Sequence, residues 1–136
     1  MKRLLLLLLL FPLVFSCRAP RSVEQFVPAP GPYSFTVDMT DSTALYNLDL
    51  YTRVDAADAP SEVQLLMRWK SPSDSLYSEE VYLPLGKGRF SKEVYAPYRS
   101  GVQPAEWGAW QLLVLIPSVP EGFRGLGLVV KKLDNQ

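Results

Sequence analysis

Apolar and polar residues alternate one by one through several segments of this chain. The clearest example is residues 33–39, YSFTVDM, in which every second side chain is apolar. Neighbouring side chains of a β-strand point to opposite faces, so this period of two predicts a strand with one buried and one exposed face. A helix would need apolar residues three or four positions apart, and the pattern therefore favours β structure.

Six further segments read as strands, either by alternation or as short apolar runs. They are residues 46–54, 63–69, 81–85, 90–95, 107–116 and 126–132. Clusters of Gly, Pro, Ser and Asp separate them, as at residues 55–60, 96–104 and 117–125. Seven short strands with turn signals between them predict an all-β fold, an antiparallel β-sandwich of about seven strands.

Two details refine this prediction. The most continuously apolar segment, residues 107–116, is expected to be a central strand buried on both faces. The segment DSLYSEEV, residues 74–81, offers the best place for a helix, with a possible N-terminal cap. Its apolar residues do not form a helical stripe of useful width, so a strand is favoured there.

The first sixteen residues have the profile of a secretory signal peptide. Lys2 and Arg3 precede a run of seven leucines, and Pro12 interrupts the apolar stretch that follows. This stretch is shorter than the roughly 20 residues that a spanning helix needs. A signal peptide over residues 1–16 is favoured, and an uncleaved N-terminal anchor helix is the alternative.

Cys17 is the only cysteine of the chain, and the residues before it are Val14, Phe15 and Ser16. This ending resembles the lipobox of bacterial lipoproteins. The resemblance implies that the thiol of Cys17 carries a diacylglyceryl group and that the new amino terminus is acylated. One cysteine cannot form a disulfide within the chain. Two or more acyl chains would anchor the protein stably to a membrane.

Residues 18–32 contain four prolines, which fix extended backbone and oppose helix and sheet. We therefore expect residues 17–32 to comprise the lipidated cysteine and a proline-rich tether. Residues 33–136 would form the β-sandwich domain.

Charge and composition exclude several classes of function. Without residues 1–16, which include Lys2 and Arg3, 12 basic residues stand against 14 acidic ones. Such a balance gives no basic footprint for nucleic acid. The chain has no histidine, so the commonest general base and metal ligand is missing. We expect no enzyme activity, no cofactor, no metal site and no catalytic residues.

Three polar clusters lack the geometry or the chemistry of a site. Glu79 and Glu80 are adjacent, so on a strand they point to opposite faces and cannot share a substrate. Asp55, Asp58 and Glu62 lack the spacing and the glycine of a calcium loop. The serines of residues 73–78 have no activating base that the sequence reveals.

Aromatic residues are the best candidates for binding. Trp69 and Trp110 continue apolar strand faces, so packing in the core is expected for both. Trp107 points away from Trp110, while Tyr95 and Tyr98 flank Pro97 at the start of the longest expected loop. Trp107, Tyr95 and Tyr98 are therefore the candidate contacts for a ligand or partner.

Several segments together resemble the GldH family of gliding-motility lipoproteins. They are the lipobox at Cys17, YNLDLYTRV at 46–54, VYLPL at 81–85, GAWQL at 108–112 and GLGLVVKK at 125–132. The resemblance implies an accessory role in gliding or type IX secretion and supplies no catalytic residue.

We accordingly expect a lipoprotein at the outer membrane, facing the periplasm, anchored by lipid on Cys17. It would work through contacts with an envelope protein partner. The alternative is a surface lipoprotein that binds carbohydrate or peptide through exposed aromatic residues.

Overall fold

The computed structural model describes residues 22–55, 60–85 and 92–134, and these residues form eight β-strands. The strands are β1 (Ser22–Pro28), β2 (Tyr33–Met39), β3 (Ala44–Val54), β4 (Glu62–Lys70), β5 (Leu76–Pro84), β6 (Lys92–Val102), β7 (Gly108–Leu115) and β8 (Phe123–Asp134). No helix able to cross a membrane occurs in these ranges. The expected signal peptide, Cys17 and residues 18–21 lie outside the described residues.

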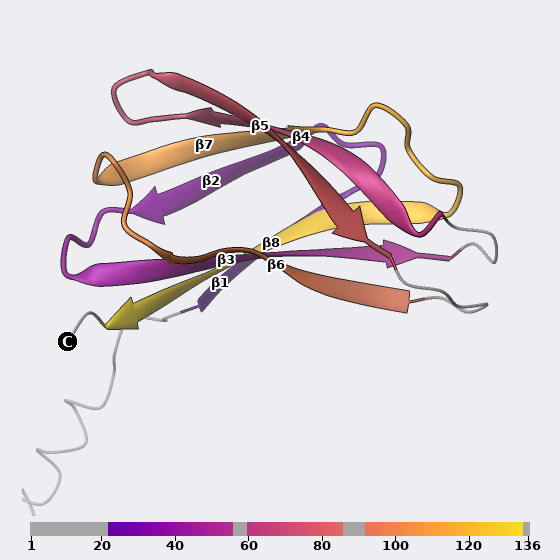
Figure 1. Ribbon diagram of the computed structural model, residues 1–136, viewed down its shortest axis with the longest axis horizontal. Helices are drawn as coiled ribbons and strands as arrows, with labels where there is room; N and C mark the ends of the chain where they lie inside the picture. Colours follow the sequence, from indigo (N-terminus) through magenta and orange to yellow (C-terminus); the bar gives the residue numbers. More distant parts are fainter. Residues whose placement is uncertain (1–21, 56–59, 86–91, 135–136) are drawn as a thin grey trace, which may run out of the picture.

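Two antiparallel sheets of four strands pack face to face, which confirms the predicted β-sandwich (Figure 1). The first sheet has the order β1-β8-β3-β6, and the second has the order β2-β7-β4-β5. Figure 1 shows the second sheet as the upper layer and the first sheet as the lower one. The edge strands are therefore β1 and β6 in the first sheet, and β2 and β5 in the second.

The core fills the space between the sheets and follows the alternation of the sequence. In β2 the four apolar residues are buried, and the three polar residues between them are exposed. Leu48 and Leu50 of β3 and Leu65 and Met67 of β4 supply the same kind of inward face. The segment 76–84 forms strand β5, as predicted, and not a helix.

The expectation that residues 107–116 are buried on both faces is wrong. Strand β7 is central, since it pairs with both β2 and β4, but its faces differ. Trp110, Leu112 and Val114 are buried, while Ala109 and Gln111 are exposed. The strand that is buried on both faces is β8, in which residues 125–130 are all buried. Aromatic side chains, described below, cover its outer side.

The predicted start of the domain at Tyr33 is also corrected. Residues 22–28, assigned to the tether, form strand β1 and pair with β8 from Ser22 opposite Lys131 to Pro28 opposite Gly125. A proline is compatible with an edge strand where its missing N–H would face away from the neighbouring strand. Pro30 and Pro32 fall in the connection that follows, and Pro20 lies outside the described residues.

Residues 96–102 were expected in a loop and instead complete strand β6. Pro97 is tolerated there because β6 is an edge strand, where a missing N–H can face solvent. The register with β3 shifts on either side of Leu48, which marks β-bulges in this part of β6. Bulges bend a strand and change the direction of its side chains.

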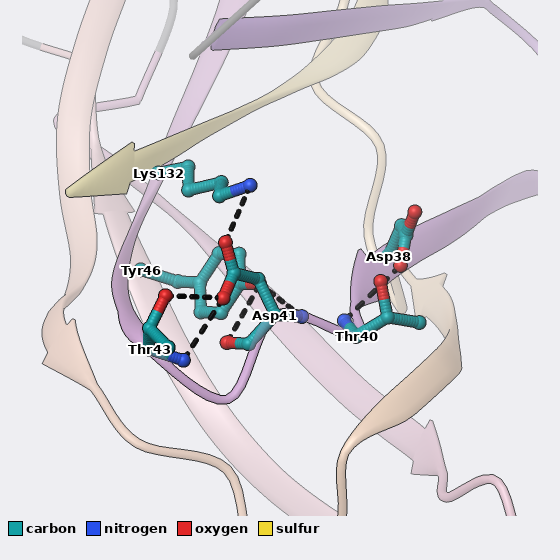
Figure 2. A network of polar contacts seen from close by, with 6 residues as sticks. All are labelled: Asp38, Thr40, Asp41, Thr43, Tyr46 and Lys132. Carbon is teal, nitrogen blue, oxygen red and sulfur yellow. Dashed lines mark hydrogen bonds and ion pairs between the residues drawn. The ribbon is translucent and has the colours of Figure 1, made fainter. Parts of the chain in front are cut away.

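A polar network fixes the turn between β2 and β3 (Figure 2). Asp41 Oδ1 accepts hydrogen bonds from the backbone N–H and the hydroxyl of Thr43, at 2.9 and 2.6 Å. Lys132 Nζ of β8 lies 2.7 Å from Asp41 Oδ2. The hydrogen bonds from Lys132 and Thr43 lower the pKa of Asp41 below its ordinary value. The network ties this turn between the sheets to strand β8 of the first sheet.

Candidate ligand-binding cavity

A cavity of about 310 Å³ opens on the flank of the sandwich where the edge strands β5 and β6 lie next to each other. Four aromatic side chains line it, one from each of four strands: Trp69 of β4, Tyr77 of β5, Tyr98 of β6 and Trp110 of β7. Core residues such as Met39 contribute apolar surface. The cavity thus reaches from the surface to the edge of the core.

Tyr98 is the residue that joins the two sheets at this cavity. Its ring stacks on that of Trp69, with centroids 6.3 Å apart and planes 8° from parallel. Its hydroxyl accepts a hydrogen bond of 2.9 Å from Trp69 Nε1 and donates one to Glu79 Oε1. The bulged course of β6 places Tyr98 across the flank from β4 and β5.

Glu79 and Arg99 form an ion pair at the mouth of the cavity. Arg99 Nη2 donates to Glu79 Oε2, while Glu79 Oε1 accepts from Tyr98. The guanidinium carbon of Arg99 also lies 5.3 Å from the centroid of the Tyr98 ring. Both side chains are partly exposed, at 30% for Glu79 and 53% for Arg99. A ligand entering the cavity therefore meets a carboxylate and a guanidinium beside aromatic walls.

Trp110 is the most buried of the four aromatic residues that line the cavity. Its ring packs edge-on against Trp69, with centroids 6.2 Å apart, and in a tilted arrangement against Tyr77, with centroids 5.9 Å apart. Its Nε1 donates a hydrogen bond of 2.9 Å to the carbonyl of Glu106. The expected core packing of Trp110 is confirmed, because only 7% of it is exposed. Trp69 is half-buried: its side chain packs against the core and also lines the cavity.

Such a cavity suits a ligand group that is mostly apolar and carries one or two polar atoms. Binding pockets generally combine aromatic walls with a few fixed polar groups that set orientation. Here the ion pair and the Tyr98 hydroxyl are the polar groups. A large apolar side chain or the apolar face of a sugar ring would match this lining.

No family model matches this chain, and no curated protein matches its sequence.

The three binding candidates from the sequence do not form one site. Tyr98 lines the cavity, but Tyr95 and Trp107 do not. Tyr95 and Tyr98 lie on strand β6, not in a loop, and their side chains leave it on opposite faces. Trp107 is 37% exposed and directly precedes strand β7.

Tyr95 belongs to an aromatic stack on the outer face of the first sheet. Its ring lies 5.1 Å from that of Tyr51, which in turn lies 5.7 Å from that of Phe26, both pairs within 22° of parallel. Tyr51 is only 3% exposed, although it points away from the core, because its neighbours cover it. Beneath it on β8 is Gly127. The stack explains why β8 is buried on both faces.

The acidic pair behaves as the strand geometry predicted. Glu79 turns toward the cavity, and Glu80 on the other face is exposed. Sequence reasoning nevertheless missed Glu79, Arg99, Trp69 and Tyr77 as lining residues. Pro97 carried the available signal, because a proline inside an apolar-alternating segment indicates an edge strand or a bulge.

The serine-rich turn between β4 and β5 is stabilised by hydrogen bonds within the turn and by one to Glu106. Ser73 donates a hydrogen bond of 2.8 Å to Glu106 Oε2, and buried Ser71 accepts one of 3.0 Å from the Ser75 N–H. The hydrogen bonds from Ser71 and Ser73 lower the pKa of Glu106, which makes this carboxylate a weaker base. The contact therefore stabilises the turn and does not activate a nucleophile.

Within the described ranges, no cluster of three acidic or cysteine side chains is placed to hold a metal ion. Of the acidic residues that lack the spacing of a calcium loop, Asp55 pairs with Arg124. Asp58 lies outside the described residues.

Tyrosine ionisation at the cavity gives a pH prediction. Burial, together with the hydrogen bond to Glu79, raises the pKa of Tyr98 from 10.0 to about 12. The unfolded chain ionises at the lower pH, so this stabilisation is complete below pH 10 and is lost as the pH rises toward about 12. We expect the free energy of unfolding to fall across this interval.

The matched variant is Tyr98→Phe, measured by urea denaturation at a series of pH values. This variant should reduce the fall in the free energy of unfolding with rising pH without abolishing it, because burial also raises the pKa of Tyr51 and Tyr33. An absorbance titration should show one fewer late-titrating phenol. If stability falls as steeply with pH in Tyr98→Phe as in the wild type, the Tyr98 hydroxyl is not a source of this pH dependence.

Proposed function

We propose that this protein is a non-enzymatic lipoprotein of the bacterial envelope that binds a protein partner through the cavity between β5 and β6. Cys17 would carry the lipid, and residues 18–21 would connect it to the folded part that begins at Ser22. The membrane would be the outer membrane, with the domain facing the periplasm. Its role would be that of an accessory subunit, positioned by the anchor.

The observation that carries this proposal is the aromatic cavity on an open flank. Tyr77, which lines the cavity, is 49% exposed. Exposed aromatic residues beside a partly apolar cavity are typical of interaction sites, and monomeric proteins otherwise keep such surface small. An Arg99–Glu79 pair at the rim adds directional contacts.

Two features of the composition support a binding role over catalysis. The chain has no histidine, and its one cysteine is assigned to the anchor. The cavity contains a carboxylate, but Arg99 and Tyr98 already engage both of its oxygens. A general base would have to be free to accept a proton from a substrate.

The resemblance to the GldH lipoproteins suggests the class of partner. We propose a component of a gliding or type IX secretion assembly, recognised by protein–protein contacts. Carbohydrate binding in the cavity is the alternative, and the experiments below separate the two.

Site-specific photo-crosslinking in intact cells tests the proposed site. A photoreactive phenylalanine at Tyr77, in the cavity wall, should crosslink to a protein of the envelope. The same group at Tyr95 is the control, because Tyr95 is at least as exposed, at 58% against 49% for Tyr77, but lies on the outer face of the first sheet, away from the cavity. Equal crosslinking at both positions, or none at Tyr77, would contradict the proposal. Mass spectrometry of the mature chain tests lipidation of Cys17 separately.

A further inference from the structure

The four edge strands of the sandwich differ in how their open sides are protected. On one flank, the Gln25 side chain of β1 bridges to the backbone of β2. Its Nε2 donates 2.7 Å to the Thr36 carbonyl, and its Oε1 accepts from the Thr36 N–H at 3.4 Å. An unpaired edge exposes such backbone groups to other chains, so the bridge blocks pairing on the β1–β2 flank.

On the opposite flank only one of the two edges is protected. Strand β6 carries Pro97 and shifts register with β3 in its second half. Proline and bulges are devices that make an edge unsuitable for pairing. Strand β5 has no proline and no bulge in its centre. It pairs with β4 over nine successive residues, Leu76–Pro84, without a register shift, and its only proline is the last residue.

Strand β5 also exposes apolar side chains. Leu76 is 77% exposed, Tyr77 49% and Tyr82 53%. A long, regular and apolar edge is one that other chains pair with readily. Tyr77 and Glu79 of this strand face the cavity. A strand added beside β5 would therefore direct every second side chain toward the same cavity.

We propose that β5 binds an extended segment of another protein by β-strand addition, with alternate apolar side chains of that segment entering the cavity. The inference rests on the proposed function and specifies how the partner is held. Backbone hydrogen bonds along β5 would supply affinity, and the aromatic walls would select large apolar side chains.

Charge indicates the chemistry of the incoming segment. Glu79 and Glu80 lie at the middle of β5, and Glu80 is exposed. Antiparallel pairing of β5 with a second copy of itself about its centre would place carboxylates opposite one another, which is unfavourable. A partner segment with a lysine or arginine at its centre, opposite Glu80, complements this edge. The occupant is therefore a basic-centred segment of a different protein.

Synthetic peptides matched to the nine residues of β5 test this mode of binding. Each alternates aromatic or aliphatic residues with polar ones and has lysine at its centre. Binding to the full-length mature protein in detergent is followed by tryptophan fluorescence, because Trp69 and Trp110 line the cavity. Two further peptides carry N-methyl groups on one or the other alternating set of backbone nitrogens.

Strand addition predicts an asymmetric result. Methylation of the set that faces β5 should weaken binding about tenfold or more, since several backbone hydrogen bonds are lost together. Methylation of the other set should leave affinity nearly unchanged. The variant Glu80→Lys should weaken binding of the lysine-centred peptide and favour a glutamate-centred one.

The outcomes separate this inference from the proposed function. Equal affinity of the two methylated peptides would overturn strand addition, while crosslinking at Tyr77 would still support a partner site. Failure of the unmethylated peptide to bind at millimolar concentration would overturn it as well. Saturable binding of an oligosaccharide in its place would assign the cavity to sugar. A dimer of the mature protein in which a photoreactive phenylalanine at Tyr77 crosslinks the two copies would assign β5 to self-association.

Discussion

Replacing Gly127 with valine is expected to lower the free energy of unfolding by about 3 kcal/mol. Gly127 lies on β8 directly between Phe26 of β1 and Tyr51 of β3. A Cβ atom at this position would overlap the ring of Tyr51, far inside van der Waals contact. Tyr51 would have to leave its position between Phe26 and Tyr95. Urea denaturation of the two proteins measures the difference.

A double-mutant cycle provides the control. In a Tyr51→Ala background the space above Gly127 is open, so Gly127→Val should cost much less than in the wild type. The difference between the two costs is the coupling between the residues. If Gly127→Val lowers the free energy of unfolding equally in both backgrounds, the destabilisation comes from the backbone of β8 and not from the aromatic stack.

Replacing Trp110 with alanine is expected to lower the free energy of unfolding by about 3–5 kcal/mol. Trp110 is 7% exposed, packs against Trp69 and Tyr77, and donates a hydrogen bond to the Glu106 carbonyl. Its loss would leave a void between the core and the cavity and remove one of the aromatic walls. Thermal and urea unfolding both report this change.

Trp107→Ala is the matched control for this prediction. It removes the same side chain three positions earlier in the sequence, but from a site that is 37% exposed and outside the cavity lining. Its cost should be about 1 kcal/mol or less. Similar losses for the two variants would show that burial of Trp110 is not what stabilises this end of the sandwich. Trp110→Phe separates packing from the hydrogen bond.

The strands could be predicted because alternation is a local property. In β2 each side chain's face follows from its neighbours, and one register places every apolar residue inward. Strand β8 departs from this pattern: Gly127 and Val129 are buried on its outer side. At Gly127 the neighbours on either side are Phe26 of β1 and Tyr51 of β3, which lie far away in sequence.

Two predictions were wrong because a proline was interpreted without knowing where its segment lies in a sheet. Prolines at 28 and 97 indicated a tether and a loop, yet both fall in strands at the edges of a sheet. A proline is compatible with a strand when its missing N–H faces away from the neighbouring strand. Whether a strand is an edge depends on sheet order, which the sequence pattern does not contain.

The sequence by itself determined that the chain forms antiparallel strands with one apolar face each, because side-chain direction alternates along any extended segment. Only the tertiary structure decided which strands lie at the edges of the sheets and which aromatic side chains contact one another. Trp69, Glu79, Tyr98 and Trp110 come from four different strands, and the cavity exists because two sheets place them on one flank. Such a meeting depends on strand order and register, which arise from packing between segments distant in the chain.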